Sequence, residues 1–288
     1  MSELLSLAGL EYSGDFVRVG GARIHYLSYG APSELPPVLL LHGGGAGSAI
    51  WYRQIAELSN TRQVIAPDHP VFGLSDQIPF EEPFLDGITG YIIGFMDALK
   101  IDRVDVIALS MGGQGAIAAC LSYPERFRRL ILIGSAGLGT DFPLVFKLSL
   151  VPYFGRLITR PNRWGQDSYF KAFEVKNTEF EGAEEYKQYA YDVTLSQGHS
   201  KAMRESINSI ANWSGQVNVF TDEALTHLDL PTLAIWGDED QLFPVSHAER
   251  LVKLGPDAHL EIIENAAHVP LLDHSDRVTE LITEFVNV

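Results

Sequence analysis

Short apolar runs alternate with longer amphipathic stretches along most of this 288-residue chain. Apolar runs, each ending in small, polar or turn residues, occupy residues 36–44, 63–70, 104–110, 129–137, 231–240 and 258–268. Such runs are typical of strands buried on both faces of a parallel sheet. Helical spacing follows most of them, near residues 49–58, 85–99, 111–122, 246–254 and 275–286. Near the N-terminus, residues 16–20 and 22–30 alternate as a hairpin would, with Gly20 and Gly21 at the turn. The pattern predicts an α/β fold with a mostly parallel, eight-stranded sheet flanked by helices.

One long region interrupts this alternation. Between residues 139 and 229 no confident buried strand is present, although aromatic residues are frequent and helical spacing occurs near 181–193 and 200–211. Some ninety residues without a strand are too many for a loop. The sequence therefore predicts a core formed by residues 1–139 and 230–288, with residues 140–229 inserted as a helical cap, or lid.

Composition narrows the classes of partner. The chain has 21 Lys and Arg against 37 Asp and Glu, a formal net charge of −16, whereas a nucleic-acid binder needs a basic face. No apolar run reaches the roughly 20 residues of a membrane helix, and the first ten residues carry Glu3 without a basic run, so we expect neither membrane attachment nor a secretory signal. The single cysteine, Cys120, which we place in the core, fits a reducing compartment. We expect a cytoplasmic monomer or homodimer acting on a small molecule.

Ser110 stands where an apolar run gives way to a helical pattern, with Ala108 before it and Gly112 and Gly113 after it. A nucleophile held on a sharp strand-to-helix turn has strained dihedral angles and tolerates only small neighbours. The usual form of the motif is G-x-S-x-G, and here Ala108 replaces the first glycine. The alternative is a serine that only caps the helix. We favour the nucleophile.

A serine nucleophile needs a base and an orienting acid, which follow it in the chain order serine, acid, histidine. Asp240 and Asp238 both lie in the loop after the run at 231–237, and we prefer Asp240 because its spacing from Gly237 and Pro244 places it at the loop crest. Asp238 remains the second choice, and either residue could simply cap a turn. His268 follows the last buried run and is the candidate base.

The glycines at residues 43–45 follow another apolar run and would let backbone amides approach a developing oxyanion. We expect the N–H groups of Gly44 and Met111 to form the oxyanion hole, with His42 packed beneath the loop. The alternatives are a plain turn or a phosphate cradle, but no lysine follows at Walker spacing. Predicted substrate contacts are Gly43, Gly45, Val269 and Trp164.

Together these segments resemble the α/β-hydrolase fold family over essentially the whole chain. The residues that carry the resemblance are 41–45, 66–76, 108–113, 236–244 and 266–270. The resemblance implies Ser110 as nucleophile, Asp240 as acid and His268 as base, with a cap between the sixth and seventh strands. The sequence departs from the family pattern at Ala267, where glycine is usual before the histidine, and at Val71, which replaces a glycine.

We therefore expect a serine hydrolase that cleaves carboxylic esters or lactones of small, largely apolar substrates through an acyl-enzyme. Metal-ligand spacings are lacking, so no metal or other cofactor is expected. Residues 42–51 and 110–113 also resemble the hydrolases that cleave carbon–carbon bonds in ring-fission products. Those enzymes carry Trp after the histidine and a cap arginine for the substrate acid, whereas here Val269 follows and Arg204 does not obviously match. Carbon–carbon hydrolysis ranks second, ahead of acyl transfer and non-catalytic binding.

Overall fold

The computed structural model describes residues 1–78, 80–151, 153, 155–156, 160–196 and 198–287. Its centre is an eight-stranded sheet in the order β1-β2-β4-β3-β5-β6-β9-β10, in which only the β1–β2 and β2–β4 pairs are antiparallel. The strands are β1 (Gly14–Val19), β2 (Ala22–Tyr29), β3 (Val38–Leu41), β4 (Val64–Pro67), β5 (Val104–Leu109), β6 (Phe127–Ile133), β9 (Thr232–Gly237) and β10 (Ala258–Ile263). The predicted fold class is confirmed.

The N-terminal hairpin forms at the predicted glycines. Val19 pairs with Ala22, and both Gly20 and Gly21 have positive φ angles, 55° and 89°. A two-residue turn whose twist matches that of the flanking strands requires two consecutive positive φ values, and glycine adopts them without steric cost.

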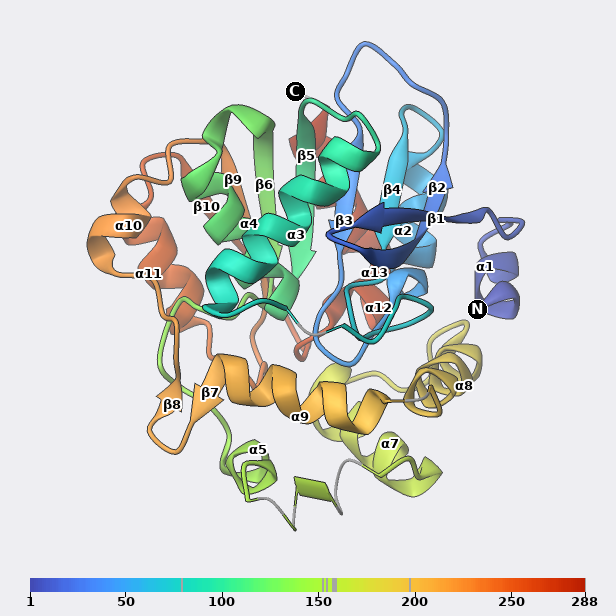
Figure 1. Ribbon diagram of the computed structural model, residues 1–288, viewed down its shortest axis with the longest axis vertical. Helices are drawn as coiled ribbons and strands as arrows, with labels where there is room; N and C mark the ends of the chain where they lie inside the picture. Colours follow the sequence, from blue (N-terminus) through green and yellow to red (C-terminus); the bar gives the residue numbers. More distant parts are fainter. Residues whose placement is uncertain (79, 152, 154, 157–159, 197, 288) are drawn as a thin grey trace.

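Helices cover both faces of the sheet (Figure 1). The helices on one face are α3 (Phe84–Ala98), α4 (Met111–Ser122), α10 (Asp222–Thr226) and α11 (Ser246–Leu254). The helices on the other face are α1 (Ser2–Leu7), α2 (Tyr52–Leu58), α12 (Pro270–Asp273) and α13 (Ser275–Val286). Two short 3-10 turns, η1 (Ser48–Trp51) and η2 (Pro124–Arg126), complete these connections. The alternation of strand side chains divides the core: Leu39 and Leu41 of β3 belong to the first face, whereas Val38 and Leu40 belong to the second. Cys120 is buried in the first, as expected.

The last strand differs from its prediction as a fully buried strand. β10 is the edge of the sheet, and only one of its six residues, Ile263, is buried, while Ile262 is 47% exposed. Its apolar run is therefore covered by neighbours on one side only, a position that periodicity alone does not distinguish from a central strand.

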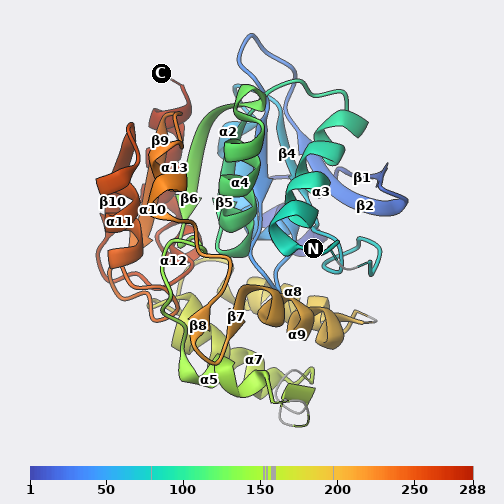
Figure 2. The same cartoon turned by 60° about the vertical axis from the view of Figure 1, so that its left-hand side comes forward.

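The segment between β6 and β9 is largely helical and lies at the carboxyl ends of the parallel strands (Figures 1 and 2). It contains α5 (Leu144–Ser149), α7 (Arg163–Tyr169), a π-helical turn η3 (Phe170–Glu174), α8 (Ala183–Thr194) and α9 (His199–Ile210). A small hairpin that the pattern did not predict follows, formed by β7 (Ala211–Asn212) and β8 (Gly215–Gln216). Leu225 of α10 packs in the same cluster as α3 and α4. We therefore propose that the cap ends before α10, inside the boundary predicted at residue 229.

None of the helices in the described part of the chain combines the length and apolar character that a bilayer crossing requires.

A buried ion cluster ties the last helix to the sheet. Asp105 of β5 accepts hydrogen bonds from the guanidinium groups of Arg62 and Arg128, and Arg62 also donates to the carbonyl of Val286 at 3.1 Å. Arg62 is 1% exposed. Removing one partner of such a pair leaves a buried charge uncompensated, which is far costlier than losing a surface pair.

We expect Asp105→Ala to lower the free energy of unfolding by about 3–5 kcal/mol, because Arg62 then stays buried without a counter-charge. Asp97→Ala is the matched control, since Asp97 is 61% exposed in its pair with Arg126 and should cost at most about 1 kcal/mol. Urea unfolding of both variants measures the difference. Equal losses would show that the Asp105 cluster has no special structural importance.

Candidate active site

Ser110 occupies a strained turn between β5 and α4. Its φ and ψ are 55° and −118°, a backbone conformation that residues other than glycine rarely adopt. Its N–H donates to the carbonyl of Ile133 at 3.0 Å, and its carbonyl accepts from Ala136 at 3.1 Å. The hydroxyl makes no capping hydrogen bond to α4, so the alternative of a plain helix cap is not what the geometry shows.

Glycines let α4 pack closely behind this turn. A Cβ atom on Gly112 would lie 2.6 Å from the carbonyl oxygens of both Leu41 and His42, and one on Gly113 would collide with the side chain of Ser135. The crowding at Gly112 therefore comes from the end of β3, and it requires a small residue at this position.

The acid and the base predicted from the sequence lie together. Asp240 Oδ2 accepts a hydrogen bond from Nδ1 of His268 at 2.8 Å, and both residues are buried. Asp240 Oδ1 accepts from the N–H groups of Leu242 at 2.8 Å and Phe243 at 3.0 Å, which fixes the carboxylate. Asp238 instead caps the adjacent loop, accepting from the N–H of Ala266 at 3.2 Å. Asp240, and not Asp238, is thus the carboxylate bonded to His268.

The bond to Asp240 leaves the lone pair of His268 on Nε2. This atom is buried and has no hydrogen-bond partner among the described residues, so the contact with the Ser110 hydroxyl is not closed in this conformation. The carbonyl of Ile133, at the end of β6, accepts the hydrogen bond of the Ser110 amide, and Gly134 is the next residue. A Cβ atom on Gly134 would lie 2.9 Å from Nδ1 of His268. The end of β6 therefore brings the serine turn and the imidazole to one place. Catalytic hydrogen bonds often tighten only when substrate is bound.

The cap holds the histidine loop through its backbone. The N–H of His268 donates to the carbonyl of Phe173 at 3.1 Å, and the N–H of Val269 donates to the carbonyl of Glu174 at 2.8 Å. The ring of Phe243 meets the imidazole edge-on, with centroids 5.3 Å apart. The π-helical turn η3 and the candidate base are thus one hydrogen-bonded unit.

The glycine loop lies against the serine. A Cβ atom on Gly43 would be 3.1 Å from Cβ of Ser110, and one on Gly44 would be 3.7 Å from Sδ of Met111. His42 packs beneath this loop as expected: its Nδ1 donates to the carbonyl of Gly43 at 2.7 Å. Burial lowers the pKa of His42, so it is a neutral structural group. The donor roles of Gly44 and Met111 remain predictions.

Asp68 holds the start of η1, just after the glycine loop, a role that was not predicted from the sequence. Oδ1 accepts from the N–H of Ser48 at 2.6 Å, and Oδ2 accepts from Nδ1 of His25 and from the N–H of Leu74, both at 2.8 Å. Burial opposes ionisation, but the His25 hydrogen bond and charge hold the pKa of Asp68 below its ordinary value. Asp68 lies within residues 66–76, one of the segments that carried the family resemblance, which was the available signal.

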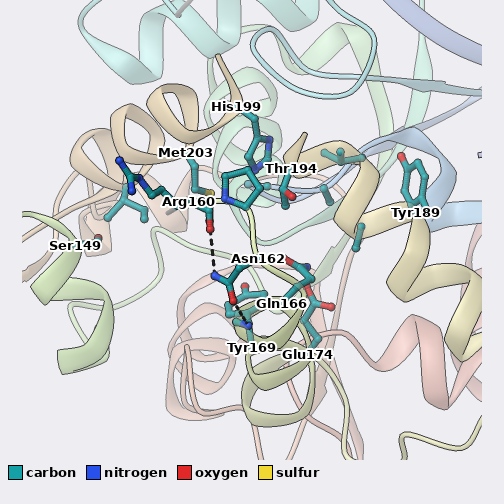
Figure 3. A pocket seen from close by; sticks show the side chains of 18 of the residues that line it. Ser149, Arg160, Asn162, Gln166, Tyr169, Glu174, Tyr189, Thr194, His199 and Met203 are labelled. Carbon is teal, nitrogen blue, oxygen red and sulfur yellow. Dashed lines mark hydrogen bonds between the residues drawn. The ribbon is translucent and has the colours of Figure 1, made fainter. Parts of the chain in front are cut away.

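Two adjoining cavities open at this site. The inner chamber, of about 50 Å³, is lined mainly by apolar side chains beside Ser110, including Phe142, Ile210 and Leu242. The outer chamber, of about 180 Å³, lies among the cap helices and carries more polar groups (Figure 3). The two chambers share the lining residues Gly44, Phe146, Tyr169, Met203 and Ile207.

One of the four predicted substrate contacts lines a chamber. Gly45 lines the outer chamber, whereas Gly43 lies beside Ser110 and lines neither. Trp164 lines neither chamber: its side chain is 81% exposed, whereas Gln166 and Tyr169 of the same helix α7 line the outer chamber. Val269 lines neither chamber, because its side chain packs in the core face that contains α12 and α13.

Two charged residues of the outer chamber were not predicted. Arg160 lines it, whereas Arg204 lines neither chamber. Glu174 is only 9% exposed, and its Oε2 has no hydrogen-bond partner among the described residues. Burial raises the pKa of Glu174 to about 7, against the opposing effects of a Tyr186 hydrogen bond and of His268. The stretch around Glu174 carries no motif, so nothing in the sequence marked it.

Comparison with known proteins is consistent with this geometry. A family model described as alpha/beta hydrolase fold matches residues 36–275, and the chain belongs to that family and is a hydrolase. It is 29% identical over 262 residues to the 2-hydroxy-6-oxo-6-phenylhexa-2,4-dienoate hydrolase of Burkholderia cepacia, covering 86% of this chain and 87% of that protein. It is 28% identical to the 2-hydroxymuconate semialdehyde hydrolase of Pseudomonas sp. (strain CF600), over 87% of this chain and 86% of that protein.

Solved structures show the same fold. The meta-cleavage product hydrolase of Pseudomonas fluorescens IP01 superposes with a TM-score of 0.81 at 27% identity, covering 95% of this chain and 97% of that one. A carboxylesterase of Bacillus subtilis also gives 0.81, at 23% identity, covering 99% of this chain and 94% of that one. The second likeness concerns the fold alone.

Glu174 gives a prediction for stability against pH. The unfolded carboxyl ionises near 4.5, whereas the folded one keeps its proton until about 7. The stability that Glu174 contributes is therefore fully present below the unfolded pKa and is lost as pH rises through the folded pKa, by about 3 kcal/mol. Glu174→Gln has no such titration. Urea unfolding from about pH 5 to about pH 8 should show wild type losing stability relative to this variant, whereas parallel curves would contradict the assignment.

Proposed function

We propose that this protein is a serine hydrolase that cleaves carboxylic esters or lactones of small, largely apolar substrates through an acyl-enzyme on Ser110. The observation that carries the proposal is the buried Asp240–His268 hydrogen bond. It leaves Nε2 of the imidazole without a partner at the carboxyl end of the parallel strands, where the backbone of Ser110 is strained. A histidine oriented by a carboxylate, beside a serine on such a turn, is the arrangement that activates a hydroxyl for acyl transfer.

In this mechanism Nε2 of His268 takes the hydroxyl proton of Ser110 as Oγ attacks the ester carbonyl. Asp240 holds the imidazole tautomer and stabilises the imidazolium that forms. The N–H groups of Gly44 and Met111 stabilise the oxyanion. His268 then donates its proton to the departing alcohol. It next takes a proton from water, which attacks the acyl group and releases the acid, and the proton returns to Ser110.

The inner chamber is evidence that the substrate has a small acyl or aryl group, because the chamber is apolar and its volume is only about 50 Å³. We place the enzyme in the cytoplasm because the chain has one buried cysteine and can form no internal disulfide.

Carbon–carbon hydrolysis of a vinylogous 1,5-diketone acid is the second candidate function. Two observations favour it: the curated relatives at 28–29% identity are named as hydrolases of such compounds, and Arg160 lines the outer chamber, where it could meet a substrate carboxylate.

A substrate panel separates these candidates. We expect purified protein to hydrolyse p-nitrophenyl esters of short acyl chains, and we expect Ser110→Ala to lower kcat by about 10³-fold or more because the nucleophile is lost. A vinylogous 1,5-diketone acid is assayed in parallel. Activity on the diketone without activity on esters would reverse the order of the two candidates, and equal turnover by Ser110→Ala would refute the mechanism.

The two neighbouring aspartates form a matched pair for the role of the acid. Asp240→Asn should lower kcat by about 10⁴-fold because the imidazole loses its tautomer and its counter-charge. Asp238→Asn should leave kcat nearly unchanged, because Asp238 contacts a backbone amide outside the catalytic set. Comparable losses in steady-state assays of both variants would contradict the assignment of Asp240.

A further inference from the structure

The outer chamber contains polar atoms that the protein itself leaves without partners. Glu174, His199 and Tyr189 line this chamber and are buried, and Oε2 of Glu174, Nδ1 of His199 and the hydroxyl of Tyr189 lack hydrogen-bond partners among the described residues. Figure 3 shows Glu174 coming from the end of η3 and His199 from the start of α9. Buried polar groups in native proteins almost always have partners. Three such atoms on the lining of one cavity indicate that a polar group of the ligand completes it.

The surroundings of Glu174 indicate which polar group this is. The Tyr186 hydroxyl and His268 lie near enough to its carboxyl to oppose the rise of its pKa, and the hydroxyl of Tyr169 lies near enough to be influenced by it. No ion pair to Glu174 occurs in the described part of the chain. Arg160 lines the same chamber, but it is solvent-exposed, whereas Glu174 is buried. At the depth of Glu174 the open position is thus an acceptor that a donor group would fill.

We propose that Glu174 determines specificity in the outer chamber by accepting a hydrogen bond from a hydroxyl or ammonium group at the far end of the substrate, and that a carboxylate at this depth is disfavoured. This inference rests on the proposed function, because the substrate is taken to be an ester acylating Ser110. A donor group satisfies Oε2 and favours the ionised carboxylate, and above the pKa of Glu174, about 7, a second carboxylate brings like charge into a buried site. Neutral His199, whose pKa burial lowers to about 4, does not offset that repulsion. The esters are therefore compared at about pH 8, where Glu174 is ionised.

The position of Glu174 allows it to affect the turnover of the ester in addition to the affinity for it. Its own carbonyl accepts the N–H of Val269, the residue directly after His268. A substrate end bound at Glu174 is therefore held by the same backbone segment that holds the candidate base. Binding energy gained at the far end of the substrate can then be used to orient the ester carbonyl at Ser110.

The test uses p-nitrophenyl esters of graded acyl length whose far end is methyl, hydroxyl, ammonium or carboxylate. At the best length we expect the hydroxyl or ammonium ester to exceed the methyl ester in kcat/KM by about tenfold, the worth of a hydrogen bond to a charged group, and the carboxylate ester to be the poorest. The ranking of the hydroxyl and ammonium arms identifies which donor the chamber prefers. This comparison within the wild-type protein does not depend on the folding of any variant.

Glu174→Gln keeps the size of the side chain and removes its charge. We expect it to abolish the ammonium advantage and to improve the carboxylate ester by about tenfold. The matched control is Glu184→Gln, because Glu184 lies on α8 of the same cap with its side chain 83% exposed. It should leave all four ratios unchanged.

Different failures separate the two proposals. Ser110-dependent hydrolysis in which all four ends react equally, in which the methyl or carboxylate ester reacts fastest, or in which Glu174→Gln changes no ratio, overturns this inference and leaves the ester hydrolase in place. Lack of Ser110-dependent hydrolysis of every ester overturns the proposed function, and this inference with it.

Discussion

The strained backbone of Ser110 is the constraint on which the rest of the structure depends. A positive φ of 55° at a serine costs of the order of 1–3 kcal/mol and persists only where the surroundings fix it. Here the fixing groups are the carbonyl of Ile133, the amide of Ala136 and the close packing of α4 on the end of β3 through Gly112. The strained turn places the hydroxyl at the carboxyl end of β5 and leaves it free of a capping bond. The N-terminus of α4 lies beside it.

The cap is joined to the catalytic groups by more than its position above them. Backbone hydrogen bonds from His268 and Val269 to Phe173 and Glu174 join the π-helical turn to the histidine loop. Irregular π-helical turns are frequent at functional sites, and this one places a carboxyl in the outer chamber while its main chain supports the base. In the proposed mechanism, substrate recognition and proton transfer therefore share one short segment, so a change in the cap is expected to alter both.

Periodicity predicted most of the fold because central strands and amphipathic helices are specified by local burial patterns, as in α11 and α13. It failed at β10, whose edge position depends on what lies beside it. The paired acid and histidine could be anticipated because Asp240 and His268 each follow a strand of one parallel sheet. Glu174 and the exposure of Trp164 could not, since each depends on contacts between segments far apart in the chain that no local pattern records. The segment that contains Asp68 carried the family resemblance, but its hydrogen bonds to Ser48 and His25 join distant segments in the same way.

The most direct test of the account is covalent labelling of the folded protein with a fluorophosphonate, followed by peptide mass spectrometry. An activated serine forms a stable phosphonyl adduct, and activation here requires the base as well as the nucleophile. The account predicts a single adduct on Ser110 that disappears when His268 is replaced by alanine. A folded protein that stays unlabelled, or that is labelled at Ser110 equally well without the imidazole, would contradict it.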